Sequence, residues 1–126
     1  MKEKQKITKF PSGNKKTETY KEDNTFVTKH FYDAKDAYVK ELTYLKDSAK
    51  EVKHYTAKGV LSKVEHFIDG KREGQEIKYF ISKADGSMKS TKTYAKGKLD
   101  GEKLTYNENG EVIKREIFKD GKLIKQ

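Results

Sequence analysis

The side chains of this sequence best suited to metal chemistry are three histidines, His30, His54 and His66. His30 and His54 are 24 residues apart, so a repeat of that length would place them at the same end of neighbouring units. Zinc needs three or four converging ligands, and carboxylates are abundant in this chain. Each histidine, however, directly precedes an aromatic residue in a strand-like segment, where solvent-facing histidine is common. We therefore expect no metal site.

Acidic residues next to glycines are the candidates for paired catalytic carboxylates. They are Asp69, Glu73, Asp100, Glu102 and Asp120. Turn formation explains acids in such positions, because Asp next to Gly favours tight turns. The chain has no cysteine, no serine in a Gly-x-Ser-x-Gly setting, and no Gly-Lys pair that completes a phosphate loop. We therefore predict no catalytic residues, no cofactor and no enzymatic activity.

The charge of the chain points to acidic partners. Twenty-nine Lys and Arg against 20 Asp and Glu give a net charge of +9. Only Arg72 and Arg115 are arginines, although specific phosphate recognition favours the planar guanidinium. A lysine-rich solvated surface is therefore the first interpretation. Binding of nucleic acid or anionic membrane is the alternative.

No membrane or export signal is visible in the sequence. No segment approaches the roughly twenty apolar residues of a transmembrane helix, and the start, MKEKQKITKF, has no apolar run behind its basic residues. The absence of cysteine fits a reducing compartment. We expect a cytoplasmic protein, and an exported protein whose leader was removed is the alternative.

A regular aromatic series indicates a repeat. With only 33% hydrophobic and 39% charged residues, a thick core is hard to build, yet aromatics return about every twelve positions. The series is Tyr20, Tyr32, Tyr44, Tyr55, Phe67, Tyr79, Tyr94, Tyr106 and Phe118. Glycines follow three, four or seven residues after an aromatic, so two turn types alternate and the full unit is about twenty-four residues long. The glycines expected at these turns are Gly59, Gly70, Gly74, Gly86, Gly97, Gly101, Gly110 and Gly121.

Segments between the turns read as strands. They mix β-branched, aromatic and charged residues at 25–32, 38–45, 50–55, 61–68, 75–81, 88–94, 102–106 and 111–118. Asp-Gly and Asn-Gly pairs are hairpin signals, at Asp69-Gly70, Asp85-Gly86, Asp100-Gly101, Asn109-Gly110 and Asp120-Gly121. Residues 33–51 lack glycine and admit a short helix, but the tyrosine spacing favours degenerate strands there. The predicted fold is all-β: an elongated, single-layer antiparallel β-meander of about five 24-residue hairpin repeats, in one domain over 1–126.

Two roles are open for the aromatic series. Its members can pack across strands and cover a thin core. Alternatively, half-exposed tyrosines beside lysines can line a groove for a protein segment, a glycan or single-stranded nucleic acid.

The phrases FIDGKREGQEIKYF, YAKGKLDGEKLTYNENG and FKDGKLIK resemble the bacterial variant of the MORN repeat, an aromatic followed by x-x-Gly-Lys-x-x-Gly. The match is good over 55–126 and degenerate over 10–54, and Lys125 replaces the second glycine of the last unit. The resemblance implies a stack of extended hairpins. Some bacterial proteins of this kind are labelled antitoxins of the YwqK type. We therefore expect a non-enzymatic protein-interaction scaffold, of antitoxin or immunity type, for an acidic protein.

Overall fold

Strands form every regular element of the protein. The computed structural model describes residues 2–126, and their side chains from residue 5 onward. The strands are β1 (Lys2–Lys9), β2 (Lys15–Glu22), β3 (Thr25–Phe31), β4 (Val39–Lys46), β5 (Ala49–Tyr55), β6 (Leu61–Ile68), β7 (Lys71–Arg72), β8 (Gly74–Tyr79), β9 (Met88–Ala95), β10 (Lys98–Tyr106), β11 (Val112–Lys119) and β12 (Lys122–Lys125). No helix forms in the described residues, so β4 and β5 occupy the segment for which a helix was the alternative.

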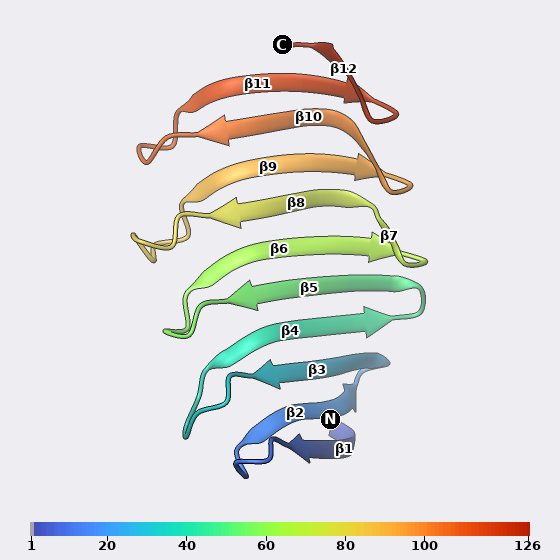
Figure 1. The fold of residues 1–126 in the computed structure, drawn as a ribbon. Coiled ribbons are helices and arrows are strands. Elements are labelled where there is room, and N and C mark those ends of the chain that lie inside the picture. The colour runs from blue at the N-terminus through green and yellow to red at the C-terminus, as the bar shows by residue number, and fades with distance from the viewer. Residues whose placement is uncertain (1) are drawn as a thin grey trace.

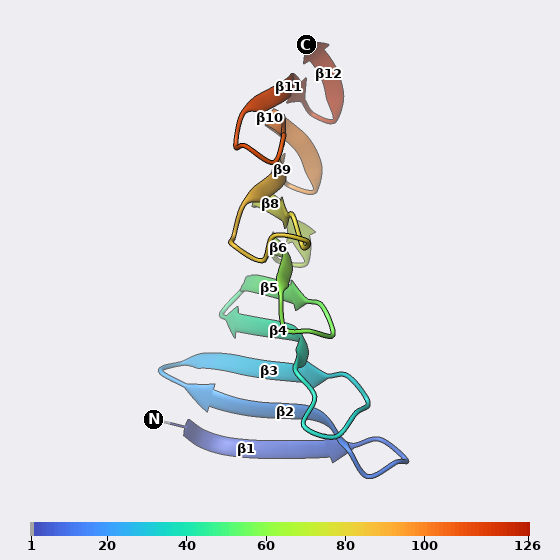
Figure 2. The same ribbon diagram turned by 90° about the vertical axis from the view of Figure 1, so that its left-hand side faces the viewer.

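All twelve strands belong to one antiparallel sheet. Neighbours in the sheet follow chain order, with short β7 pairing with β6 beside the main path. Figure 1 shows the strands stacked like rungs, with the two chain termini at opposite ends of the stack. Seen along the strands in Figure 2, the sheet is a single layer, and β1 to β3 are rotated relative to β8 to β11 by the accumulated twist. The predicted elongated β-meander is confirmed.

Two kinds of turn occupy the two ends of the rungs, as the sequence predicted. The tight-turn end holds two-residue turns after β2, β4, β6, β9 and β11, and the wide-turn end holds the longer connections. Asp69 and Gly70 have φ values of 50° and 80°, and Lys96 and Gly97 have 51° and 88°. Two successive positive φ values define the type I′ turn, whose twist matches that of the flanking strands.

Gly74 and Gly101 do not lie in turns. Gly74 begins β8, and Gly101 lies inside β10, so the expected hairpin at Asp100-Gly101 is instead formed by Lys96-Gly97. The register between β10 and β9 shifts between Leu99 and Lys103, which marks an irregularity with extra residues on β10. This irregularity favours glycine at position 101, because the φ of Gly101 is +109° and an added Cβ would lie 3.3 Å from the Thr93 Cβ.

Wide turns are closed by a side chain that imitates the backbone. Thr56 Oγ1 accepts hydrogen bonds from the backbone N–H groups of Lys58 and Val60. Asn107 Oδ1 accepts from Asn109 and Glu111 in the same way, four strands further along the sheet path. At Gly59 a Cβ would lie 2.8 Å from the Tyr38 ring, so this position requires glycine. At these two wide turns, the polar residue at the first position therefore sets the length of the turn.

Successive tight turns are also bonded to one another. Gly97 N–H donates to the Arg72 carbonyl at 2.9 Å, and Gly121 N–H donates to the Leu99 carbonyl at 2.7 Å. The stems of Lys71 and Lys98 lie beside Gly97 and Gly121. The repeated Gly-Lys pairs are thus explained by packing between repeats.

Gly97→Val should lower the free energy of unfolding by at least about 1 kcal/mol, because valine is strained at positive φ. A Cβ there would lie 3.8 Å from Lys71 Cβ, an ordinary contact, so the backbone and not a clash causes the cost. Urea unfolding measures the change. Hydrogen exchange should accelerate in 79–118 before 20–55, because each repeat contacts mainly its neighbours.

Ser90→Val, in β9, is the control and should cost little, since valine favours extended backbone. Ser62, also in a strand, is less suitable because its Oγ donates to the His54 carbonyl at 3.1 Å. Equal, whole-chain loss of protection in both variants would contradict the repeat architecture.

Candidate functional site

Cross-strand register sorts the side chains onto two faces of the sheet. Directly opposed residues share a face, and successive residues of a strand alternate. Val52 opposes Glu65, whereas the adjacent Glu51 opposes Tyr44 and His66. We call the two sides the Glu65 face and the Tyr44 face.

The repeat aromatics do not form one face. Tyr44 opposes Glu51 of β5, whereas Phe67 opposes the preceding residue, Lys50. The two rings therefore lie on opposite faces. The same register places Tyr94 and Phe118 on the Glu65 face. Tyr20, Tyr44, Tyr55, Tyr79 and Tyr106 lie on the Tyr44 face. Tyr32 lies just beyond β3, and its hydroxyl donates to the Tyr55 carbonyl at 2.7 Å.

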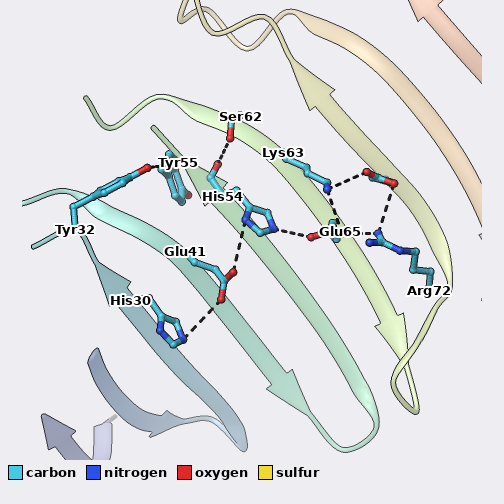
Figure 3. Close-up of polar contacts among 10 residues, drawn as sticks. His30, Tyr32, Glu41, His54, Tyr55, Ser62, Lys63, Glu65 and Arg72 are labelled. Atoms are coloured by element: carbon cyan, nitrogen blue, oxygen red, sulfur yellow. Dashed lines mark hydrogen bonds and ion pairs between the residues drawn. The ribbon is translucent and has the colours of Figure 1, made fainter. Parts of the chain in front are cut away.

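A chain of polar contacts crosses the Glu65 face (Figure 3). His30 Nε2 lies 3.8 Å from one oxygen of Glu41, and His54 Nδ1 lies 3.7 Å from the other. His54 Nε2 is 2.6 Å from Glu65 Oε1. The expected placement of His30 and His54 at the same end of neighbouring repeats is therefore confirmed, since both reach Glu41.

Arg72 completes this network at the tight-turn end. Its Nη1 lies 2.5 Å from Glu65 and 3.6 Å from Glu76, and Lys63 Nζ lies 3.5 and 3.3 Å from the same two carboxylates. Glu65 and Glu76 are each only 6% exposed. The Arg72 guanidinium also lies over two rings, those of Phe67 and Tyr94, at 5.3 and 5.5 Å. Two buried acids thus share one aromatic-flanked arginine.

Sequence reasoning missed this cluster. Arg72 was singled out only as a rare arginine, and Glu65 and Glu76 were not candidates. The signal was an arginine at a position of a lysine-rich repeat where a planar group can stack between two rings. The local sequence around the two glutamates does not predict the cross-strand pairing that brings them together.

The protonation of Glu65 is set by opposing effects. Burial acts to raise the pKa of this carboxyl, but hydrogen bonds from His54 and Arg72 and the charge of Lys63 outweigh burial and hold the pKa below its ordinary value. For Tyr94, burial and the nearby Glu76 carboxylate raise the phenol pKa. Glu65 is therefore held as a carboxylate and Tyr94 as a neutral phenol.

His66 lies apart from the other two histidines, on the Tyr44 face. Its Nδ1 donates to the Gln75 carbonyl at 2.7 Å, and its Nε2 lies 3.0 Å from Glu51. Within the described residues no group of three or more His, Asp or Glu side chains is arranged to hold a metal ion. His66 is thus a cross-strand bridge.

The turn acids have structural contacts. Asp69 and Asp120 hold positive φ in tight turns. Glu73 Oε1 accepts from the Lys96 N–H, Asp100 Oδ2 accepts from the Asp120 N–H, and Glu102 pairs with Arg115 at 3.3 Å. Each acid fixes a turn or a neighbouring strand.

Lysine and arginine side chains cover many of the rings. Cations lie within 6 Å of the ring centroids of Phe10, Tyr20, Phe26, Phe31, Tyr32, Tyr44, Phe67 and Tyr94. The shortest ammonium contact is Lys50 over Phe67, at 4.8 Å. The cations and their stems thus cover these aromatic rings. In the described part of the chain, the rings of Tyr55, Tyr79 and Tyr106 carry no such cover.

Comparisons with known proteins bear on the fold. No protein-family model matches the chain, and no curated protein matches it. Among solved structures the chain is similar to part of the one titled "Crystal Structure of TarM", with a TM-score of 0.55 and 17% identity over 86% of this chain. The matched region is 21% of TarM. At 17% identity, the similarity to TarM concerns the fold alone.

Among the described residues no helix has the length and apolar character to span a membrane.

Arg72→Met should lower the free energy of unfolding by about 2 kcal/mol, since it leaves two buried carboxylates without their arginine. Breaking a fully buried ion pair costs more than this. The expected loss is smaller here because the side chain of Arg72 is 36% exposed. Arg115→Met is the matched control. Arg115 and its partner Glu102 are 60% and 50% exposed, and the loss should stay within about 0.5 kcal/mol. Equal losses in urea titrations would contradict the role of Arg72.

Glu65→Gln tests the lowered pKa of Glu65. The folded-state pKa lies below the unfolded value of about 4.3, so ionised Glu65 adds stability above that pH. Wild type should therefore exceed the variant in unfolding free energy above about pH 5, and this difference should shrink as pH falls through the folded-state pKa. Urea titrations at several pH values measure it. A difference that grows on acidification would contradict this prediction, and exposed Glu102→Gln is the control.

Proposed function

We propose that the chain is a non-enzymatic scaffold that docks an acidic protein. One observation carries the proposal: acids are buried and bases are not. Glu18, Glu65, Glu76 and Glu116 are each less than 9% exposed, whereas no Lys or Arg among residues 5–126 is buried. The charged side chains that reach the surface of these residues are therefore predominantly basic.

The geometry of the sheet supports a binding role. Both faces are open, because no second layer of the described residues packs on either one (Figure 2). The network on the Glu65 face pairs its ionisable side chains with one another, from His30 to Glu76, which favours structure over catalysis. A long open sheet offers area, and protein contacts of standard size use about 800 Å² on each partner.

The resemblance to bacterial MORN repeats extends the proposal. We assign the repeat units at 55–126 to that class and the units at 10–54 to degenerate copies of it. An antitoxin or immunity-type role, with an acidic toxin as partner, follows from the same resemblance. A strongly acidic partner would meet the exposed lysines, and such charge complementarity raises association rates more than affinity.

The test is direct binding to polyanions of different classes. Labelled poly-glutamate, duplex DNA and phosphatidylserine vesicles are titrated with the protein at about 50 and 200 mM salt, a range over which counterion release changes phosphate binding strongly. We expect poly-glutamate to bind more tightly than DNA or vesicles at the higher salt. Poly-lysine of equal length is the control and should not bind.

Two results would contradict the proposal. Tighter DNA or vesicle binding, falling steeply with salt, would favour the nucleic-acid or membrane alternative. Turnover of nucleotides, esters or glycans that persists through repurification would establish an enzyme.

A further inference from the structure

Three tyrosines form a line on the Tyr44 face near the wide-turn end. Tyr55, Tyr79 and Tyr106 are the residues next to His54, Lys78 and Thr105 in β5, β8 and β10. His54, Lys78 and Thr105 lie in one cross-strand row on the Glu65 face. Lys63 and Ser90, on the strands between them, are the intervening residues of this row. The tyrosines therefore share the opposite face and one position along the strands. We call them the tyrosine row.

These rings differ from the aromatics that lie beneath cations in being available to a ligand. All three are partly exposed, and none lies under a cation among the described residues. Their hydroxyls have no hydrogen-bond partner in that part of the chain, in contrast to Tyr32, whose hydroxyl is bonded to the Tyr55 carbonyl. Each ring thus offers both a face and a free O–H donor to a ligand.

The spacing of the row limits what can bind to it. Successive tyrosines are two strands apart, which gives about 9.6 Å. Figure 1 shows β5 to β11 stacked in chain order, and Figure 2 shows the sheet twisting along this stack, so the row turns gradually about it. A ligand that touches all three rings must present a similar group about every 9.6 Å.

A polyproline II helix presents groups near this spacing and leaves its backbone carbonyls free. It has three residues per turn and a rise of about 3.1 Å, so every third residue returns to one side after about 9.3 Å. An α-helix returns after seven residues and about 10.5 Å. An extended strand presents one side at about 6.6 or 13 Å. The α-helix comes close to the spacing as well, but its carbonyls are bonded within the helix, so polyproline II is the conformation that can accept from the tyrosine hydroxyls.

The surroundings of the row specify the rest of the ligand. Met88 and Val112 oppose Tyr79 and Tyr106 and are 39% and 44% exposed, so apolar surface continues between the rings. A hollow of about 310 Å³ beside Tyr79 is lined by Ile81 and Lys89 among others, and Lys78, which also lines it, belongs to the Glu65 face. Lys89 has no ion-pair partner among the described residues. Charge complementarity therefore favours acidic residues in the ligand.

We propose that the tyrosine row binds a polyproline II segment with proline at every third position and acidic residues between. The prolines rest on the rings of Tyr55, Tyr79 and Tyr106. The tyrosine hydroxyls donate to the ligand carbonyls, which are free because this helix has no internal hydrogen bonds. This inference rests on the proposed function and names the part of the acidic partner that is recognised.

Three labelled twelve-residue peptides test the inference by fluorescence anisotropy. The first repeats Glu-Pro-Glu, the second has the same composition with irregularly spaced prolines, and the third is all glutamate. We expect the regular peptide to bind at least about fivefold more tightly than the irregular one. Tyr79→Ala should weaken its binding about tenfold, the size of effect typical of an aromatic anchor.

Matched variants separate binding from folding. Phe118→Ala removes a repeat aromatic from the opposite face and should leave the affinity unchanged. Tyr79→Phe keeps the ring and removes only the hydroxyl, so it should weaken binding about threefold even if Tyr79→Ala is poorly folded. Lys89→Glu should weaken binding as well, through repulsion of the acidic residues.

The outcomes distinguish the two proposals. If all three peptides bind equally and the tyrosine variants have no effect, the tyrosine row is overturned and the acidic-partner scaffold stands. If the glutamate peptide binds and the regular proline peptide does not, the tyrosine row is likewise overturned and the acidic-partner scaffold stands. If none of the three binds at about 50 mM salt, the acidic-partner function itself is contradicted.

Discussion

A side chain in this protein can be buried only by its cross-strand neighbours, because no second layer covers either face of the sheet. Val52 and Val64, at 6% exposure each, lie mid-strand, where residues of both adjacent strands surround them. Long lysine stems extend this cover over the aromatic rings. The high lysine content is therefore part of the packing as well as the charge of the surface.

The same constraint explains why glutamates are buried here. A mid-strand carboxylate such as Glu65 is enclosed by neighbours whether or not it is apolar, so it must be neutralised in place. Arg72, Lys63 and His54 provide that compensation from three different strands. The arrangement ties β5, β6, β7 and β8 together at the middle of the stack. It also removes acids from the accessible surface, which supports a basic face for acidic partners.

Regular spacing gives this architecture a second property, a surface with a fixed period. Each hairpin repeat adds two strands, so any residue type kept at one repeat position recurs about every 9.6 Å. Where lysines cover the rings, that period serves packing. Where the rings of Tyr55, Tyr79 and Tyr106 are uncovered, it offers an extended partner a matched set of contacts.

Much of the fold was determined by the sequence itself. Strand positions from 25 to 118 and the alternation of two turn types follow from local chemistry, because glycine after Asp, Asn or Lys permits the positive φ of hairpin turns. What the sequence could not decide was the face on which each aromatic lies. Tyr44 and Phe67 are both members of the regular aromatic series. Tyr44 opposes Glu51 of β5 and Phe67 opposes the adjacent Lys50, so the two rings lie on opposite faces. Because side chains alternate with a period of two, a difference of one residue exchanges the faces, and only the paired sheet fixes that register. The Glu65, Glu76 and Arg72 cluster depends on the same pairing and was invisible for the same reason.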